Sequence, residues 1–145
     1  MIYHSEIEAQ AALKKLFGFI APAQFDAIAA GFTCKVPQFY YNQAVCQAAV
    51  IAAMPEKVEP NKSSDDAIVK LHYSEGQRQY YVTELGILPN RHLAFGLIHI
   101  GPKFRPIVGY ISLPMILKGG AELDFYWSPV TVERVRERIF LDRLG

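Results

Sequence analysis

A carboxylate and an imidazole are the side chains of this sequence that could most directly move a proton. Glu84 follows Thr83 in a predicted strand, and His72 lies one predicted strand earlier. Alternate residues of a strand share a face, so we expect Tyr80, Val82 and Glu84 on one face, with His72 across the hairpin. Such a pair can act as general acid and base, which gives one hypothesis, a small hydrolase or transferase that uses Glu84 with a nearby histidine. The structural alternative is a cross-strand polar contact.

Metal, covalent and nucleotide chemistry lack a motif in this sequence. His92 and His99 differ by an odd number of positions, so a continuous strand would place them on opposite faces. Gly119-Gly120 lacks the flanking pattern of a phosphate-binding loop. We therefore assign no catalytic residue, no metal ligand and no cofactor. The only two cysteines, Cys34 and Cys46, lack the C-x-x-C spacing and are predicted to be buried thiols of a reducing compartment.

Three aromatic runs suggest a binding surface instead: Phe39–Tyr41, Tyr80–Tyr81 and Phe125–Trp127. Adjacent strand residues point to opposite faces, so one ring in each strand run must leave the face that packs on helices. Tyrosine and tryptophan on an exposed face are typical interface anchors. The alternative is that the terminal helix or the connector covers this face. The predicted binding residues are Tyr80, Tyr81, Glu84, Tyr126 and Trp127.

Basic residues give a further alternative, a nucleic-acid accessory factor. Such a role requires Lys103 and Arg105 to converge with the arginines of the terminal helix while nearby acids point elsewhere. In that helix Arg134, Arg136, Arg138 and Arg143 alternate with Glu133, Glu137 and Asp142, a pattern typical of a solvated helix with ion pairs. The net charge of +1 provides no long-range field for an acidic partner or an anionic membrane.

The first third of the chain is predicted to be helical. Ser5 and Glu8 form a capping box that begins a helix. Pro22 begins a second helix that Gly31 ends. A third, from Pro37 to Met54, is apolar nearly all round and is expected to be a central core helix. The first helix presents an apolar stripe made of Ala9, Leu13, Leu16, Phe17 and Ile20.

The rest of the chain is predicted to be mainly antiparallel strand. A polar connector, residues 55–66, separates the two parts. Ser112 is expected to cap a short helix, and Ser128-Pro129 to begin a last helix that ends near Leu141. The fold class is therefore α+β, a helical N-terminal third packed on an antiparallel sheet of about five strands with a C-terminal helix. We predict one domain, residues 1–145. The expected strands are 67–73, 78–85, 92–100, 107–111 and 122–127.

The sequence also bears on location. Its N-terminus lacks the pattern of a signal peptide, and no apolar run reaches the roughly 20 residues that span a bilayer. We therefore expect a cytoplasmic protein with no membrane partner. The oligomeric state stays open.

Four short motifs between Asp66 and Trp127 resemble a family of small domains of unknown function found on bacterial plasmids and integrative elements. They are Ile68-Val69-Lys70-Leu71, Tyr80-Tyr81-Val82-Thr83-Glu84, Phe95-Gly96-Leu97 and Gly109-Tyr110-Ile111-Ser112-Leu113. The sequence departs from the family by a tyrosine in place of the second-strand tryptophan and by its helical first third. The resemblance implies a sheet and a mobile-element setting. The leading hypothesis is a non-enzymatic accessory protein that binds another protein by an aromatic-lined sheet face or edge, such as an inhibitor of a host defence system or an immunity-type partner.

Overall fold

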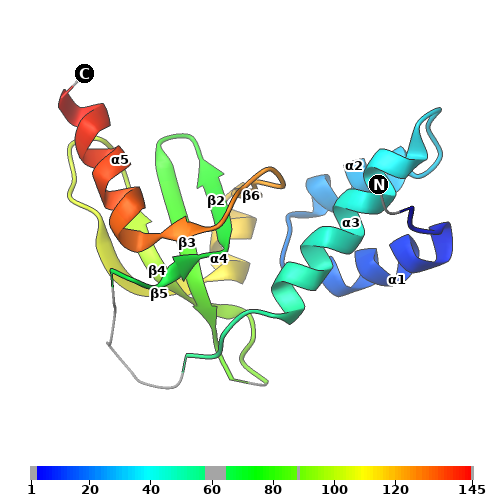
Figure 1. The fold of residues 1–145 in the computed structure, drawn as a ribbon, viewed down its shortest axis with the longest axis horizontal. Coiled ribbons are helices and arrows are strands. Elements are labelled where there is room, and N and C mark those ends of the chain that lie inside the picture. The colour runs from blue at the N-terminus through cyan, green and yellow to red at the C-terminus, as the bar shows by residue number, and fades with distance from the viewer. Residues whose placement is uncertain (1–2, 58–64, 88, 145) are drawn as a thin grey trace. The chain divides into compact units, whose positions relative to one another are not determined.

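The computed structural model describes residues 3–57, 65–87 and 89–144 (Figure 1). The chain divides into two compact units, Met1–Ala53 and Met54–Gly145, and each is considered by itself. Helices in the first unit, and a five-stranded antiparallel sheet with a C-terminal helix in the second, confirm the predicted α+β class. The prediction of one domain, with the helices packed on the sheet, stays a prediction. Residues 58–64 of the predicted connector lie outside the described residues.

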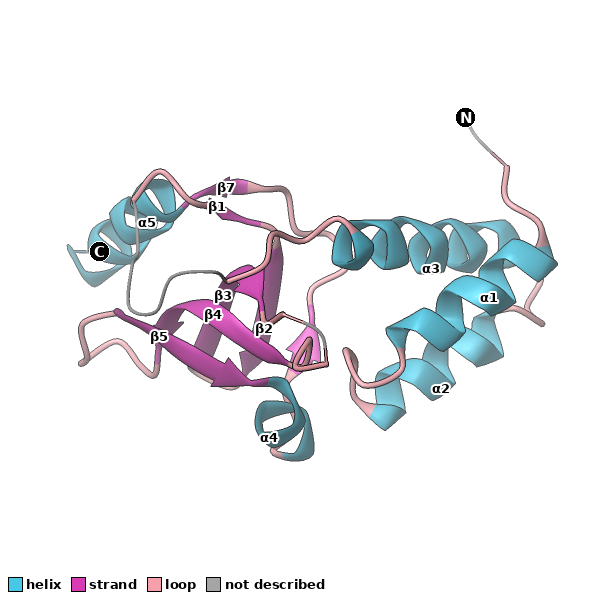
Figure 2. Ribbon diagram, turned by 90° about the horizontal axis from the view of Figure 1, so that it is seen from below, coloured by secondary structure: helices cyan, strands magenta, loops and turns pink. Residues whose placement is uncertain are grey.

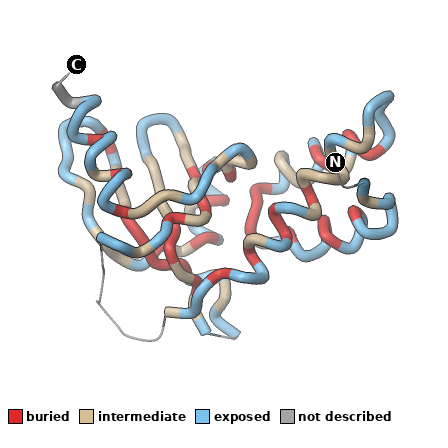
Figure 3. Tube along the Cα trace, in the orientation of Figure 1, coloured by how far each residue is buried: buried red, intermediate tan, exposed pale blue. Residues whose placement is uncertain are grey.

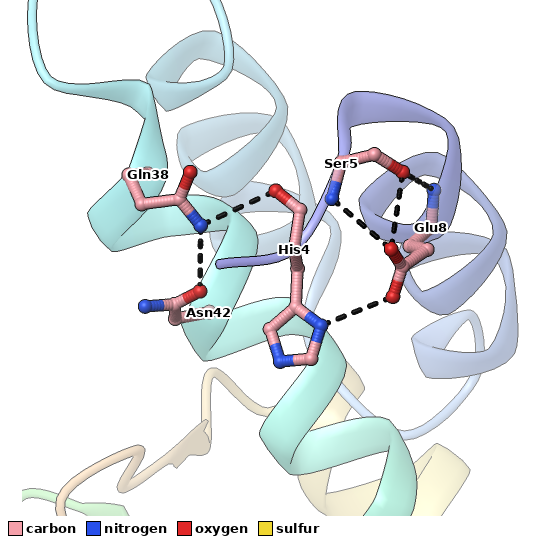
Figure 4. A network of polar contacts seen from close by, with 5 residues as sticks. All are labelled: His4, Ser5, Glu8, Gln38 and Asn42. Carbon is pink, nitrogen blue, oxygen red and sulfur yellow. Dashed lines mark hydrogen bonds and ion pairs between the residues drawn. The ribbon is translucent and has the colours of Figure 1, made fainter. Parts of the chain in front are cut away.

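The helical unit begins with the predicted capping box (Figure 4). The Glu8 N–H donates to Ser5 Oγ (3.1 Å), and the Ser5 N–H donates to Glu8 Oε1 (3.3 Å). His4 Nδ1 lies 3.1 Å from the other carboxylate oxygen, and this contact, followed by the Ser5 bond, lowers the pKa of Glu8. Gln38 Nε2 donates to the His4 carbonyl (3.2 Å), which connects the third helix to the start of the first. The three helices are α1 (Glu6–Leu16), α2 (Pro22–Gly31) and α3 (Pro37–Ala52).

The predicted apolar stripe of the first helix is only partly correct. Ala9, Leu13 and Leu16 are buried as expected. Gly18 adopts φ 85°, a left-handed conformation that ends the helical path, so Phe17 is the C-cap residue and is 75% exposed. The four-residue spacing therefore continues in the sequence beyond the point at which the helix stops.

The prediction of a fully surrounded third helix is wrong, as is the prediction of buried thiols. Cys34 and Cys46 are both exposed. Three helices in so short a unit can cover only a stripe of one another, and that stripe on α3 consists of Ala44, Gln47, Ala48 and Ile51.

The second unit is built on the predicted antiparallel meander. Its five-stranded sheet has the order β5-β4-β3-β2-β6, with every neighbouring pair antiparallel. Gly76, with φ 58°, makes the turn of the predicted first hairpin. A separate two-stranded pair joins β1 to β7. The strands are β1 (Ile68–Val69), β2 (Leu71–Glu75), β3 (Arg78–Leu85), β4 (Leu93–His99), β5 (Ile107–Ser112), β6 (Glu122–Leu123) and β7 (Val130–Thr131).

Helices lie on both sides of this sheet (Figure 2). α5 (Val132–Leu144) and the β1–β7 pair lie on one side, and α4 (Leu113–Lys118) lies on the other. Residues of the central strands are buried between them (Figure 3). On the α5 side the core cluster consists of Val69, Leu97, Val132, Val135 and Ile139.

Two predicted boundaries near the C-terminus are wrong. β6 ends at Leu123 instead of Trp127, because Asp124 Oδ1 accepts from the Tyr126 N–H (2.9 Å) and turns the chain. The last helix begins at Val132 instead of Ser128-Pro129, because the residues in between pair with β1. The Ser112 cap of α4 is confirmed, since its hydroxyl accepts from the Met115 N–H.

Candidate functional site

Two of the predicted binding residues meet in one aromatic cluster. Tyr81 stacks on the ring of His72, with centroids 4.9 Å apart and planes 10° apart, and Trp127 packs against both rings at 4.9 and 5.8 Å. Trp127 Nε1 donates to the Val69 carbonyl (2.9 Å). The cluster therefore joins β2 and β3 to the segment that follows β6.

Polar atoms on both sides of the His72 ring hold it in place. Nδ1 lies 3.3 Å from Asp124 Oδ2, and Nε2 lies 2.6 Å from Gln79 Oε1. Gln79 in turn donates from its amide nitrogen to the Gly76 carbonyl (3.4 Å). Each ring nitrogen thus faces an acceptor oxygen, which fixes the ring against Tyr81.

This aromatic cluster lies under α5 and is not an open binding face. Tyr81 and Trp127 both pack against the core cluster of α5. Burial raises the pKa of the Tyr81 phenol, the charge of Asp142 adds to the rise, and Arg138 opposes it. For Tyr81 and Trp127 the alternative stated above therefore holds, because the terminal helix covers both rings.

The remaining predicted aromatic residues lie apart from the cluster. Tyr80 pairs with Tyr73 and Ile98 and so occupies the opposite face of the sheet, where it is half-buried. Tyr126 is 76% exposed on the turn after β6. The structure thus brings together Tyr81 and Trp127 alone among the predicted binding residues that it describes.

A β-bulge moves Glu84 to an unexpected face. The β3–β4 register passes from Val82–Gly96 to Glu84–Phe95, so Thr83 is an extra residue, and its hydroxyl donates to the Phe95 carbonyl (3.2 Å). Glu84 therefore shares a face with Phe95 and Tyr81, not with Tyr80 and Val82. The predicted common face of Tyr80, Val82 and Glu84 is wrong.

Glu84 contacts a lysine instead of a histidine. Lys57 Nζ lies 3.6 Å from Glu84 Oε2 and 3.9 Å from the centroid of the Phe95 ring. The side chain of Lys57 is only 6% exposed, although the sequence predicted a solvated connector there. Its N–H donates to the Leu85 carbonyl (2.8 Å), and the Leu85 N–H donates to the Pro55 carbonyl (2.9 Å), so the chain after Ala53 is bound to the end of β3.

The space beside Glu84 does not favour the enzyme hypothesis. The cavity that Glu84, Thr83 and Val132 line has a volume of about 10 Å³, room for one water molecule. Small-molecule sites have volumes of roughly 300 Å³ or more. His72 and Glu84 also have different polar partners, so the expected acid and base pair is not assembled.

Two of the basic residues of α5 form ion pairs. Arg134 Nη1 lies 3.3 Å from Glu137 Oε2, and Arg136 Nε lies 3.2 Å from Asp65 Oδ1. Lys103 and Arg105 are exposed in the loop between β4 and β5. Across residues 3–57, 65–87 and 89–144, no group of three or more His, Cys, Asp or Glu side chains is placed to hold a metal ion. None of the helices in those ranges is both long and apolar enough to cross a membrane.

One feature that the sequence did not point to is the outer edge of β5. β5 pairs with β4 through an unshifted register. Beyond their last pair, the Leu113 N–H donates to the His92 carbonyl (3.1 Å), whereas the Leu93 carbonyl accepts from Gly86 on the opposite side of β4 (2.7 Å). Because hydrogen-bonded and non-hydrogen-bonded pairs alternate in an antiparallel ladder, the residues of β5 that bond to β4 are Ile107, Gly109 and Ile111.

The alternation also identifies the groups that point outward. The N–H and C=O groups of Val108 and Tyr110 face away from β4, where the described residues provide no strand to receive them. Tyr110 packs edge-on against Phe95, with ring centroids 5.3 Å apart, and is still 47% exposed. Strand order determines which strand lies at an edge, so the sequence of β5 by itself could not reveal this site.

Comparisons with protein-family models, curated proteins and solved structures found no match to this chain.

Proposed function

We propose that this chain is a non-enzymatic protein-binding module that receives an extended segment of another protein along the outer edge of β5. One observation carries the proposal: the outward backbone groups of Val108 and Tyr110 lack a strand partner in the described chain. Such groups are a template for strand addition. Natural edges are usually protected by charge, proline or a bulge, but β5 has an unshifted register and the uncharged sequence Ile-Val-Gly-Tyr-Ile-Ser.

Exposed apolar side chains surround this edge and would contact a bound strand. Ile107 is 61% exposed on one face of β5, and Tyr110 is exposed on the other. Ile100 and Phe104, in the loop that joins β4 to β5, are exposed as well. A bound strand would gain backbone hydrogen bonds from β5 and apolar contacts from these side chains.

The biological setting rests on the resemblance described above. A bacterial mobile element, with a host defence component or an immunity-type partner as the bound protein, belongs to this proposal, and so does a cytoplasmic site of action. Catalysis at Glu84 and nucleic-acid binding through Lys103 and Arg105 are the competing functions.

The test is a selection of peptides from a random display library against the full chain, followed by measurement of each selected peptide on two variants. Tyr110→Pro removes the outward N–H and the ring, whereas Tyr110→Val removes the ring and keeps the N–H. Proline is tolerated where an edge residue points its N–H to solvent, so both variants should keep the wild-type circular dichroism. Both lose the contact of the Tyr110 ring with Phe95, so their melting temperatures should be similar to each other.

We expect Tyr110→Pro to weaken binding by about tenfold or more relative to Tyr110→Val, since a bound strand loses one backbone hydrogen bond and meets the proline ring. In the complex the amides of Val108 and Tyr110 should become protected from hydrogen exchange. Peptides that bind both variants equally, or that protect amides far from β5, would contradict the proposal.

A further inference from the structure

We infer that the partner strand places a large apolar side chain, best an aromatic ring, opposite Gly109 of β5. This inference rests on the proposed function of the β5 edge and names the kind of residue that the edge selects. Alternate residues of a strand share a face. Ile107, Gly109 and Ile111 therefore lie on the face opposite α5, because Val108, between the first two, packs against the core cluster of α5. Gly109 leaves a gap in this row of side chains.

The gap at Gly109 extends from β5 into β4. Gly109 pairs with Gly96, so two neighbouring positions on this face lack side chains. Among the described residues, a Cβ on Gly109 would have only Ile98 Cδ1 within 4 Å, at 3.7 Å. The place of the missing side chain is therefore not filled by a neighbour. The pairs that flank the two glycines on the same face are Ile98–Ile107 and Ala94–Ile111.

The backbone pattern of β5 would bring a partner side chain close to this gap. The outward groups of Val108 and Tyr110 would bond to an antiparallel partner strand, so the residue opposite Gly109 would belong to a non-hydrogen-bonded pair. The Cα atoms of such a pair are about 4.5 Å apart, and the side chains are closer than in a hydrogen-bonded pair. Aromatic rings that cover a glycine stabilise sheet edges. A ring opposite Gly109 would also reach its diagonal neighbour Ile107, which is 61% exposed.

A second copy of this chain fits the edge less well than a different polypeptide does. The antiparallel self-pairing that covers all of β5 is centred on Gly109, so it places one glycine opposite the other and leaves the gap unfilled. A centre at Val108 would place Tyr110 opposite Pro106, which has no N–H to donate. A centre at Tyr110 would require residues of α4 to pair as a strand, and larger shifts pair still less of β5.

The test uses two capped peptides that share flanking threonines and valines and carry either phenylalanine or alanine at the centre. Binding of each to the full chain is followed by NMR titration, through the amide signals of Val108 and Tyr110, which detects weak complexes as well as tight ones. We expect the phenylalanine peptide to bind about fivefold more tightly, as a favourable cross-strand pair allows. Its ring should give nuclear Overhauser contacts to the Hα protons of Gly109.

Glycine substitutions show whether the gap is responsible for this preference. Gly109→Ala should reduce the preference for phenylalanine and Gly109→Val should abolish it, because the new side chain takes the place of the ring. Gly101→Ala, in the loop between β4 and β5, is the matched control. A Cβ there would approach no described atom closer than Phe104 Cδ2 at 3.6 Å, so this variant should fold and keep the preference. Circular dichroism checks the fold of all three variants.

The possible failures are distinguishable. Equal affinity for the two peptides, with shifted Val108 and Tyr110 amides in both complexes, would overturn the selection of a large residue and leave the binding edge standing. Unshifted amides with both peptides would count against the binding edge itself, and so against the inference. Ring contacts to Tyr110 without contacts to Gly109 would overturn the inference, as would a wild-type dimer in sedimentation velocity that Tyr110→Pro dissociates.

Discussion

Among the described residues, the chain that follows β6 closes that edge of the sheet, whereas no strand lies beside the outer edge of β5. β6 pairs with β2 over two residues, and the chain then turns at Asp124, whose carboxylate contacts both the Tyr126 N–H and His72. Trp127 returns to the sheet and donates to the Val69 carbonyl. β5 is six residues long, uncharged and unshifted in register.

The difference shows how one sheet can be protected from strand addition at one edge and available for it at the other. A short charged strand followed by a side-chain turn leaves little length for a foreign strand to pair with. The longer, apolar β5 has no such protection from the described residues. The cluster of His72, Tyr81 and Trp127 thus lies beside the protected edge, and the opposite edge is the candidate binding site.

The largest expected effect contrasts the interior of the sheet with its open edge. Gly96 and Gly109 lie opposite each other on β4 and β5. A Cβ on Gly96 would lie 1.9 Å from the Tyr81 carbonyl oxygen, whereas a Cβ on Gly109 would approach nothing closer than Ile98 Cδ1 at 3.7 Å. Gly96→Ala should therefore reduce the free energy of unfolding by about 3 kcal/mol or more, and Gly109→Ala should change it by less than about 1 kcal/mol.

Urea denaturation of both variants measures this contrast. Equal losses of stability at the two positions would show that β4 is packed similarly against β3 and β5. In that case the surroundings of Gly109 on β5 would be as crowded as those of Gly96.

A second prediction concerns the loss of the Trp127 ring beside the closed edge. Trp127→Ala removes the ring that packs on His72 and Tyr81 and the donor to Val69, so the free energy of unfolding should fall by about 2 kcal/mol. Tyr126→Ala, one position earlier and largely exposed, is the matched control and should stay within about 0.5 kcal/mol of wild type. A Trp127→Ala variant with unchanged stability and lost partner binding would instead support the prediction that this tryptophan contacts the partner.

A third prediction tests which backbone amides of β5 bond to β4 and which point outward. The amides of Gly109 and Ile111 donate to β4, whereas those of Val108 and Tyr110 point outward. Hydrogen exchange of the free protein should therefore be slower by about tenfold or more for the first pair, which corresponds to about 1.4 kcal/mol of opening free energy. The Asp124 amide, which donates to the His72 carbonyl (2.8 Å), should be protected at the closed edge. Uniform protection along β5 would mean that its outer side is already occupied.

The smallest expected effect is a pH dependence at the closed edge. The folded protein raises the pKa of Tyr81 above its unfolded value, so the neutral phenol stabilises the fold. This contribution is complete below the unfolded pKa of about 10 and is lost as the pH rises through the higher folded value. Tyr81→Phe should therefore lose less stability than wild type between pH values of about 9 and 11. Parallel alkaline slopes in urea denaturation would contradict the burial of this hydroxyl.

Local chemistry predicted much of the fold. The capping box at Ser5, the second helix from Pro22 to Gly31, the hairpin turn at Gly76 and the Ser112 cap are each determined by residues within a few positions, and each is present. The bulge at Thr83 and the turn at Asp124 were missed. The bulge depends on how β3 meets β4, and the turn depends on a side chain that competes with the strand.

The candidate site was harder to predict than the elements. Tyr81 and Trp127 meet as the aromatic pattern suggested, but the pattern could not show that α5 covers them. Glu84 lies on the face opposite to the predicted one, because the extra residue Thr83 reverses the alternation of side chains between the two faces of β3. Val108 and Tyr110 carry no distinctive sequence signal, because their availability follows from the position of β5 at the end of the strand order.

The closed β6 edge also limits where the sheet can add further strands. A sheet with two open edges can add strands at both and grow head to tail without limit, as filaments do. With β6 ended by the Asp124 turn, growth at that side has no starting point, so the described sheet can be extended only beyond β5. This chain could therefore end a growing sheet at one side, but it could not link two sheets through both of its edges.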